Sequence, residues 1–489
     1  MISLDNTVDA ASLLKIIQDQ QLTIEKLSAR LEQLLHLLYG TRTEKRRSSG
    51  DEKEEADKQK PAPKPKDTQE QNASKGRRPL PSDLARVRII HDLPLEKQYC
   101  PCGCKMNRMG QITTEQLDLK PAELFIKEHV RYKYVCRACE TIISAPLPPQ
   151  PIEKGLPGPG LLAEVIVNKY QDALPLYRQE QRFSRLGIEL NRSTLCDWIM
   201  DCAFLCEPIV ALMKQDVVAG FRLFTDDTPI AVLAKGKTHT GRLWVYVGGG
   251  QEKPLAAVYD YTHTRNKKGP QAFLKGYRGY LQADAYPGYD VLYKDGEIIE
   301  VGCWAHCRRK FFEITLSAKK EGLADTALDF IGQLYGVERR ATNFNPLERR
   351  WLRRKYSKPI LKVFKRWLLQ QQAKALPKTP IGQAIAYALN HWQALNNYLR
   401  DGHLNIDNNT AERSIKTVVI GRKNWLFAGS AEGARKAAIL YSLMETCKLN
   451  SINPYAYLKD ILTRLPTTLS KDLRSLLPYH WKPLPNKNP

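Results

Sequence analysis

The chain has 489 residues, more than one hydrophobic core usually supports, so we expect two to four domains joined by linkers. Lys and Arg number 75 against 52 Asp and Glu, and the formal net charge of +23 suits a polyanionic partner, with nucleic acid favoured over a membrane surface. We find no apolar run of 18 residues and no signal-peptide pattern, so we expect a cytoplasmic protein that neither spans a bilayer nor is exported.

The first predicted element is a helix over residues 1–40. Its apolar side chains occupy the a and d positions of a heptad repeat, which only Gln20 interrupts. This pattern predicts a short parallel coiled coil and therefore a homo-oligomer, and an amphipathic helix that packs on its own chain is the alternative. The heptad positions are held by Leu13, Ile17, Ile24, Leu27, Leu31, Leu34 and Leu38.

Residues 41–78 differ sharply in composition from the helix before them. They are rich in Lys, Glu, Asp, Gln, Ser and Pro, and they contain almost no large apolar side chain. Such a segment cannot bury enough surface to offset the entropy lost on ordering, so we expect a disordered linker.

Five of the 11 cysteines fall into two tight clusters within residues 79–150. The second cluster is a C-x-x-C pair, a spacing that lets two thiolates reach one tetrahedral zinc ion, and the first is C-x-C-x-C, with three candidates for two places. A strand over 130–135 would lead into the second cluster. We predict a zinc-finger module with structural Zn²⁺, and unmetallated thiols are the alternative. The candidate ligands are Cys100, Cys102, Cys104, Cys136 and Cys139, of which four would bind the ion.

Residues 151–216 are predicted to be helical and to contain a helix-turn-helix. The segment QEQRFSRLGIELNRSTLCDWIMDC indicates two short helices separated by a turn at Gly187, with Asn191 or Ser193 capping the second. We expect Arg192, Ser193 and Thr194 to contact DNA, although helix pairs of this kind also occur in proteins that bind no DNA.

From residue 217 the hydrophobic period changes to two, which is typical of strands. Segments 221–226, 242–248 and 254–261 are predicted as three successive antiparallel strands. A helix over 269–275 and further strands in 279–289 and near 299–303 are predicted to follow, the last leading into a helix. This order is that of a ribonuclease-H-like mixed sheet. We therefore predict a catalytic core over 217–445, interrupted by a helical insertion at about 315–400 and followed by a helical cap over 446–489.

Three acids fall at informative points in this core. Asp226 and Asp284 are predicted to end two neighbouring strands, and Glu412 lies in the first turns of a helix that Asp407 or Asn408 would cap. Three converging carboxylates would form a site for two Mg²⁺ or Mn²⁺ ions, which support phosphoryl transfer. Alternatively, the aspartates are turn residues and Glu412 pairs with a base on an exposed helix.

Long segments of the chain resemble the transposases of bacterial insertion sequence 66, a branch of the DDE transposases. The resemblance rests on TDDTPIAVL, LQADAYPGY, GCWAHCRRKFFE and IDNNTAERSIKTVVIGRKNWLFAGS, and it extends over nearly the whole sequence. It implies that Asp226, Asp284 and Glu412 are the catalytic, metal-binding acids. Asp227 stands where many members have glutamate, so the choice between the two adjacent acids stays open.

The resemblance also implies the activity, which is metal-dependent cleavage of DNA at transposon ends and transfer of the strand to a target. The implied partners are terminal repeats, target DNA and small accessory proteins. A nuclease of the same fold and a catalytically silent DNA-binding regulator are the rival interpretations. Basic and polar side chains near the acids are candidate DNA contacts. They are His306, Arg309, Arg413, Arg422 and Lys423.

Overall fold

The computed structural model describes residues 101, 123–135, 142–153, 155–234, 236–250, 256–317 and 321–483. The chain divides into two compact units, one of residues 43–130 and the other of residues 1–42 with 131–489. The fold below is that of the described part of the second unit. The predicted coiled coil, the predicted linker and the five clustered cysteines lie outside the described residues and stay predictions.

A short antiparallel hairpin precedes the main body of this unit. Strands β1 (Lys133–Val135) and β2 (Ile142–Ser144) pair with Tyr134 opposite Ile143. The first of them falls within the strand predicted over residues 130–135. Both Tyr134 and Ile143 are exposed, so the hairpin has no apolar core among the described residues.

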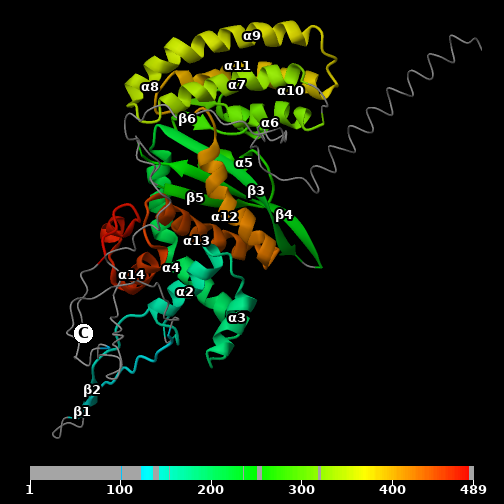
Figure 1. The fold of residues 1–489 in the computed structure, drawn as a ribbon. Helices are drawn as coiled ribbons and strands as arrows, with labels where there is room; N and C mark the ends of the chain where they lie inside the picture. Colours follow the sequence, from blue (N-terminus) through cyan, green and yellow to red (C-terminus); the bar gives the residue numbers. More distant parts are fainter. Residues whose placement is uncertain are drawn as a thin grey trace, which may run out of the picture. The chain divides into compact units, whose positions relative to one another are not determined.

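A six-stranded mixed sheet organises the unit (Figure 1). Its strands are β3 (Arg222–Ala234), β4 (Lys237–Gly248), β5 (Ala256–Thr262), β6 (Gly279–Gln282), β7 (Ile298–Val301) and β8 (Phe427–Ala428). The order is β5-β4-β3-β6-β7, and β8 pairs with the distal part of β3. The first three strands are antiparallel, as the sequence predicted, and β6 and β7 run parallel to β3.

The two faces of the sheet are covered by different helices. Trp244 and Tyr246 share one face of β4, because alternate residues of a strand point to the same side. Tyr246 stacks on Phe273 of α5 (Lys268–Phe273) at a centroid distance of 3.6 Å. On the same face, Trp244 meets Tyr289 of the 3₁₀ helix η2 (Pro287–Leu292).

The opposite face is covered by α12 (Asn409–Trp425) and α13 (Ala431–Leu449). Val245 of β4 pairs with Tyr259 of β5, so the two side chains lie on this second face. The Tyr259 hydroxyl donates to the backbone oxygen of Ser414 on α12 at 2.7 Å. This bond places α12 over the face that carries the odd-numbered residues of β4.

Three helices precede the sheet: α2 (Pro159–Tyr170), α3 (Leu176–Arg185) and α4 (Arg192–Val218). Gly187 forms the predicted turn between α3 and α4 with a φ of +82°, which glycine adopts without steric cost. The prediction of two short helices is wrong for the second, which continues for 27 residues. Buried side chains recur along α4, which packs on β5 and α13, and this packing sustains the helix.

The predicted cap of α4 is also different. Asn191 takes the N-cap position, but its side chain makes no capping hydrogen bond. Instead, the backbone N–H of Arg192 donates to Glu180 Oε1 of α3 at 3.0 Å. A contact between the two helices therefore replaces the local cap, which residue type alone does not reveal.

Between β7 and α12 the chain forms a group of helices with a core of its own (Figure 1). Buried Trp304, Phe364 and Tyr398 belong to this core, and α7, α9 and α10 pack on one another or on α6. The elements are α6 (Trp304–Thr315), α7 (Leu323–Arg340), α8 (Pro346–Leu352), the π-helical turn η3 (Arg353–Ser357), α9 (Lys358–Gln372), α10 (Pro380–Asn390), α11 (Trp392–Asn396) and η4 (Asn397–Leu399).

The described chain ends in α14 (Pro454–Arg464) and the 3₁₀ turns η5 (Leu465–Thr467) and η6 (Ser470–Leu476). Helix α14 packs on α2, so helices far apart in the sequence contribute to one core. Within the described residues, no helix is both long enough and apolar enough to cross a bilayer.

Candidate active site

Asp226 and Asp284 belong to two neighbouring segments of the sheet. Strands β3 and β6 are parallel neighbours, with Arg222 opposite Tyr280 and Phe224 opposite Gln282. This register joins residues 58 positions apart, which is also the separation of the two aspartates, although the pairing itself ends at Phe224 and Gln282. The chain that leaves β6 carries Asp284 close enough for its negative charge to act on Asp226.

The prediction that both aspartates end their strands is wrong for Asp226. Asp226 lies inside β3, whereas β6 ends at Gln282, two residues before Asp284. On this side β3 pairs with β6 up to Phe224 and with β8 only from Ala231 onwards. The intervening part of β3 is free of a strand neighbour there, which leaves room for side chains to gather around Asp226.

Glu412 is carried to this part of β3 by α12. Asn408 is fully buried just before the helix, and its Nδ2 donates to the backbone oxygen of Thr225 at 2.8 Å. The Asn408 backbone N–H donates to Cys303 Sγ at 3.2 Å. Asn408 holds the N-cap position as predicted, yet its side chain binds β3 rather than capping the helix. Glu412 then falls in the first turn of α12.

Strand pairing shows which face Asp226 occupies. Asp226 pairs with Val245, and Val245 lies on the sheet face that α12 covers. Asp226 therefore faces the helix that carries Glu412. Asp227 pairs with Trp244 and faces the opposite side, toward η2.

Burial and neighbouring acids shift the proton affinity of the two aspartates. The pKa of Asp226 is raised to about 7 by burial and by the negative charges of Asp284, Asp227 and Glu412, against a hydrogen bond from the Asp227 backbone N–H. Burial also raises the pKa of Asp284, although the charges of His306 and Arg265 oppose the rise. Asp284 and Glu412 thus both act on Asp226, so negative charge is concentrated around this part of β3.

Asp227 is already neutralised by two arginines. Its side chain is 1% exposed, Oδ2 accepts from Arg242 at 3.0 Å, and Oδ1 accepts from Arg265 at 2.8 Å. Both carboxylate oxygens are thus engaged on the face away from Glu412. Of the two adjacent acids, Asp226 is the one whose charge lacks an arginine partner among the described residues.

Arg265 was not among the sequence candidates. Its Nη2 lies 2.8 Å from Asp227 and 3.6 Å from Asp284 Oδ2, and its guanidinium lies 4.2 Å from the ring centre of Tyr286. Arg265 therefore links Asp227 to Asp284, one of the three proposed site acids. It lies between β5 and α5, outside every motif considered, and only the folded chain brings it here.

Helix α6 brings two basic groups to Glu412. His306 Nδ1 lies 3.5 Å from Glu412 Oε1, and Arg309 Nη2 lies 3.8 Å from Oε2. Neither His306 Nδ1 nor Glu412 Oε1 makes a hydrogen bond within the described part of the chain, and both atoms are buried. The structure thus places His306 beside the acids, where the sequence expected it.

Cys303, His306 and Glu412 also have potential ligand atoms within 4.8 Å of one another. Cys303 Sγ already accepts the Asn408 N–H, and burial raises the pKa of its thiol to about 12. A thiol is a soft ligand, whereas Mg²⁺ and Mn²⁺ prefer oxygen donors. We therefore regard Cys303 as a structural link between α6 and α12.

The other candidate DNA contacts have different surroundings. Arg413 and Lys423 are exposed on α12. Arg422 instead donates through Nη1 to the Thr228 hydroxyl and to the backbone oxygen of Pro229, both at 2.6 Å, and so ties α12 to β3. At the start of α4, Arg192 and Ser193 are exposed and Thr194 is partly buried.

Three family profiles match the chain. The profile described as Transposase IS66 family matches residues 154–436, and that of the IS66 C-terminal element matches residues 442–479. The zinc-finger binding domain of transposase IS66 matches residues 97–140, which include all five clustered cysteines. These matches define the chain as a transposase, a class of DNA-processing enzymes. The chain belongs to the IS66 family.

Relatives in Sinorhizobium fredii are similar over most of the chain, and each is named only as an uncharacterized protein. The protein y4hP is 35% identical over 425 residues, which cover 83% of this chain and 77% of y4hP. The protein y4jD is 32% identical over 82% of this chain and 81% of its own length. The protein y4qI is 31% identical over 98% of this chain and 90% of its own length.

Proposed function

We propose that this transposase cleaves DNA at the ends of its insertion sequence and transfers the freed 3′ ends to a target, using Asp226, Asp284 and Glu412. The observation that carries the proposal is the arrangement of the three elements that bear the acids. Asp226 lies in β3, Asp284 follows the parallel neighbour β6, and α12, which carries Glu412, covers the sheet face on which Asp226 lies. The negative charges of Asp284 and Glu412 both act on Asp226.

The donor set fits two divalent cations of the hard type, Mg²⁺ or Mn²⁺. All three donors are carboxylates, and burial together with the negative charges of Asp284, Asp227 and Glu412 raises the pKa of Asp226. When bound, such ions would activate an attacking hydroxyl and stabilise the leaving oxygen of a phosphodiester. Asp226 would also have to lose its proton, which binding of a cation favours.

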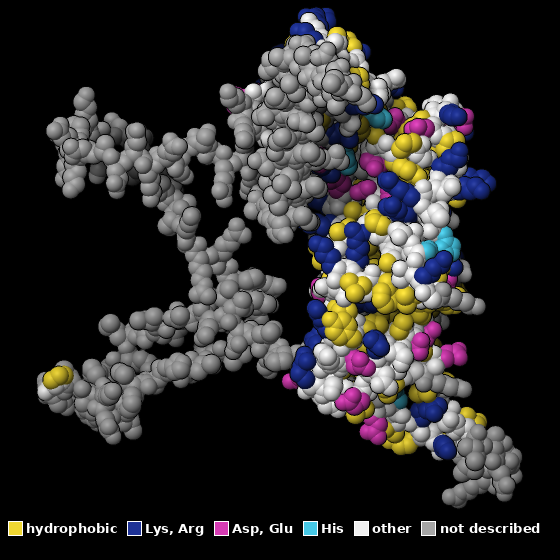
Figure 2. Space-filling model, turned by 90° about the vertical axis from the view of Figure 1, so that its right-hand side faces the viewer, with side chains coloured by type: hydrophobic (Ala, Val, Ile, Leu, Met, Phe, Trp, Pro, Cys, Tyr) yellow, Lys and Arg dark blue, Asp and Glu magenta, His cyan; other side chains and the backbone are white. Residues whose placement is uncertain are grey.

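The protein's own groups would orient the substrate. His306 and Arg309 lie beside Glu412 and present positive charge or hydrogen-bond donors to a phosphate near the acids. Figure 2 shows Lys and Arg side chains along the length of the face in view, with acidic and apolar side chains among them. Basic side chains spread along a face can contact DNA, which carries charge along its whole length.

We also infer that the sheet is of the ribonuclease-H-like type. Three antiparallel strands followed by two parallel ones, in the order β5-β4-β3-β6-β7, support this assignment. Acids on β3 and after β6 would then lie on adjacent central strands, where a metal site can form. The helical group between β7 and α12 would be an insertion in this core.

The test of the function uses the purified full-length chain and labelled duplexes copied from the ends of the insertion sequence that carries its gene. We expect Mg²⁺ or Mn²⁺ to support strand cleavage and EDTA to abolish it. Pre-cut ends should be joined to a target plasmid. Cleavage without joining would identify a nuclease, and specific binding without cleavage in either metal would identify a silent regulator.

For residues 97–140 we propose structural zinc held by Cys136, Cys139 and two of the three upstream cysteines. We expect about one Zn²⁺ per chain by atomic absorption of the purified protein. A Cys136→Ser/Cys139→Ser variant should lose it, while Cys447→Ser, which alters a buried thiol of α13, should retain it. Full zinc content in the double variant would contradict the assignment.

A further inference from the structure

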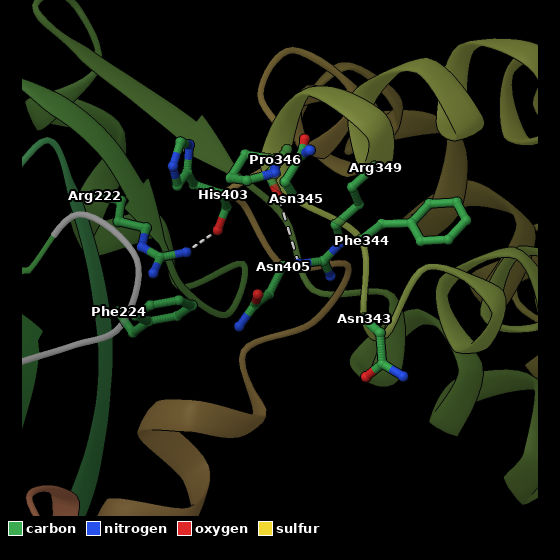
Figure 3. A pocket seen from close by; sticks show the side chains of 10 residues that line it. Arg222, Phe224, Asn343, Phe344, Asn345, Pro346, Arg349, His403 and Asn405 are labelled. Carbon is green, nitrogen blue, oxygen red and sulfur yellow. Dashed lines mark hydrogen bonds between the residues drawn. The ribbon is translucent and has the colours of Figure 1, made fainter.

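A pocket of about 460 Å³ opens beside β3, between the sheet and the loop that leads to α8 (Figure 3). Arg222 and Phe224 contribute to it from β3, and the loop before α12 closes another side. Phe224 is 1% exposed and forms an apolar wall. The polar lining consists of Arg222, Arg349, His403, Asn343, Asn345 and Asn405.

The pocket carries positive charge and has no acidic side chain in its lining. Figure 3 shows the guanidinium groups of Arg222 and Arg349 directed toward each other, with Asn405 between them. Arg222 is 6% exposed, and burial and the charge of Arg349 lower its pKa to about 10, while Asp401 outside the lining opposes this. Two cations that repel each other inside a cavity would be stabilised by an anion.

The arginines are held in place by groups that do not fill the pocket. Arg222 Nη1 donates to the backbone oxygen of His403, and Arg349 Nη1 to that of Gly402 at 3.4 Å. Arg349 also pairs through Nη2 with Glu338 at 2.7 Å. The guanidinium groups are therefore preorganised, and the three asparagine amides can add neutral N–H donors.

The pocket lies on the same sheet face as the proposed catalytic acids. Arg222, Phe224 and Asp226 alternate along β3 and so point to one side. Arg222 precedes Asp226 by four residues, which is roughly 13 Å along a strand. A stacked nucleic-acid strand covers that distance in about four nucleotides, at about 3.4 Å each.

We propose that this pocket binds a backbone phosphate of the substrate DNA, within about four nucleotides of the phosphodiester that is cut. The proposal rests on the proposed function, because it assigns a second contact to the same DNA strand. A phosphodiester matches the chemistry of the lining, since guanidinium and amide N–H groups both donate to phosphate oxygens. The contact would fix the register of the strand over Asp226.

The test adds a negative charge to the pocket without changing its shape. Asn405→Asp and Asn343→Asp each replace an amide by a carboxylate of the same size, and neither removes an arginine. Asn343 is exposed, and Asn405 Nδ2 makes only a 3.5 Å contact with the Thr410 hydroxyl among the described residues. Asn390→Asp, at the exposed end of α10, adds the same charge elsewhere in the helical group.

Binding is measured by fluorescence anisotropy, without divalent metal, on a labelled duplex copied from the end of the insertion sequence. Single phosphates are replaced in turn by neutral methylphosphonates. For the wild type we expect one position near the cleavage site to cost about tenfold in affinity. Asn405→Asp and Asn343→Asp should each bind the unmodified duplex about tenfold more weakly than the wild type. Replacing the phosphate at that position by a methylphosphonate should then cost these variants no further affinity.

Asn390→Asp should bind like the wild type. The proposal is overturned if every methylphosphonate weakens the variants as much as it weakens the wild type, because the pocket and the phosphate would then act independently. It is also overturned if Asn390→Asp weakens binding as much as the two pocket variants do. Because no metal is present, the result is independent of catalysis. A chain that shows the coupling but never cuts with Mg²⁺ retains the subsite and refutes the proposed activity.

Discussion

Replacing Asp226 by asparagine is expected to reduce DNA cleavage by at least about 10³-fold, because one of the three carboxylates that would hold the metal ions is lost. The fold should survive, since asparagine has the same size and its oxygen can still accept the Asp227 backbone N–H. Cleavage of the labelled duplex with Mg²⁺, at equal binding affinity, measures the effect. Near-normal cleavage would refute the metal-binding role of Asp226.

The same substitution should stabilise the metal-free protein at neutral pH. The folded-state pKa of Asp226 is about 7, above the ordinary 3.8, so the native state holds a proton that the unfolded state releases. The wild type therefore loses stability as pH rises from about 4 to about 7, and the deficit is constant above that. We expect Asp226→Asn to gain on the order of 2 kcal/mol at pH 8 and almost nothing at pH 4.

Asp227→Asn is the matched control for the direction of this change in the free energy of unfolding. Asp227 is buried with two arginines, so removing its charge leaves Arg242 without this carboxylate and Arg265 with only the more distant Asp284. We expect its free energy of unfolding to fall, whereas that of Asp226→Asn rises. Asp295→Asn, on an exposed turn, should change neither stability nor cleavage. Urea denaturation in EDTA at pH 4 and pH 8 distinguishes the variants, and equal shifts for both aspartates would contradict the assignment.

Replacing Arg353 by methionine is expected to destabilise the protein by about 3–5 kcal/mol. Arg353 is fully buried in η3, and Nε and Nη2 donate to the two carboxylate oxygens of Glu338 at 2.7 and 2.8 Å. The remaining donors reach backbone oxygens of Tyr398, Asp401 and Leu404, at 2.7 to 2.9 Å. Methionine would leave a buried carboxylate and three carbonyl groups short of a donor.

The effect of Arg353→Met should extend to the proposed active site, because Tyr398 to Leu404 lie on the connection that leads to α12. Arg354→Met tests whether the destabilisation is specific to Arg353. The neighbouring Arg354 is exposed, so its loss should lower the free energy of unfolding by less than about 0.5 kcal/mol. Arg353→Lys keeps the charge but cannot make the same set of bonds, so it should fall between the two. Equal urea midpoints for Arg353→Met and Arg354→Met would show that this network does not stabilise the chain.

Local patterns in the sequence predicted much of the sheet. The alternating segments around Phe224, Val245 and Val258 correspond to β3, β4 and β5, because side-chain alternation is a property of the strand itself. Gly187 likewise marks its turn through its own backbone freedom. The lengths of the elements were less predictable. Strand β3 continues beyond Asp226, and α4 is much longer than the short helix that was predicted, because pairing and packing with distant segments stabilise both.

By itself, the sequence determined the residue types of a carboxylate site, the positions of three acids in family motifs and the excess of positive charge. Only the tertiary structure decided that Asp226 faces α12, while Asp227 forms ion pairs with Arg242 and Arg265. Neighbouring acids in a strand are chemically alike, and what separates them is the opposite direction of their side chains. The side chains that contact the two aspartates come from segments far away in the sequence. Which of them contact which aspartate therefore depends on long-range packing, and a local sequence pattern does not predict it.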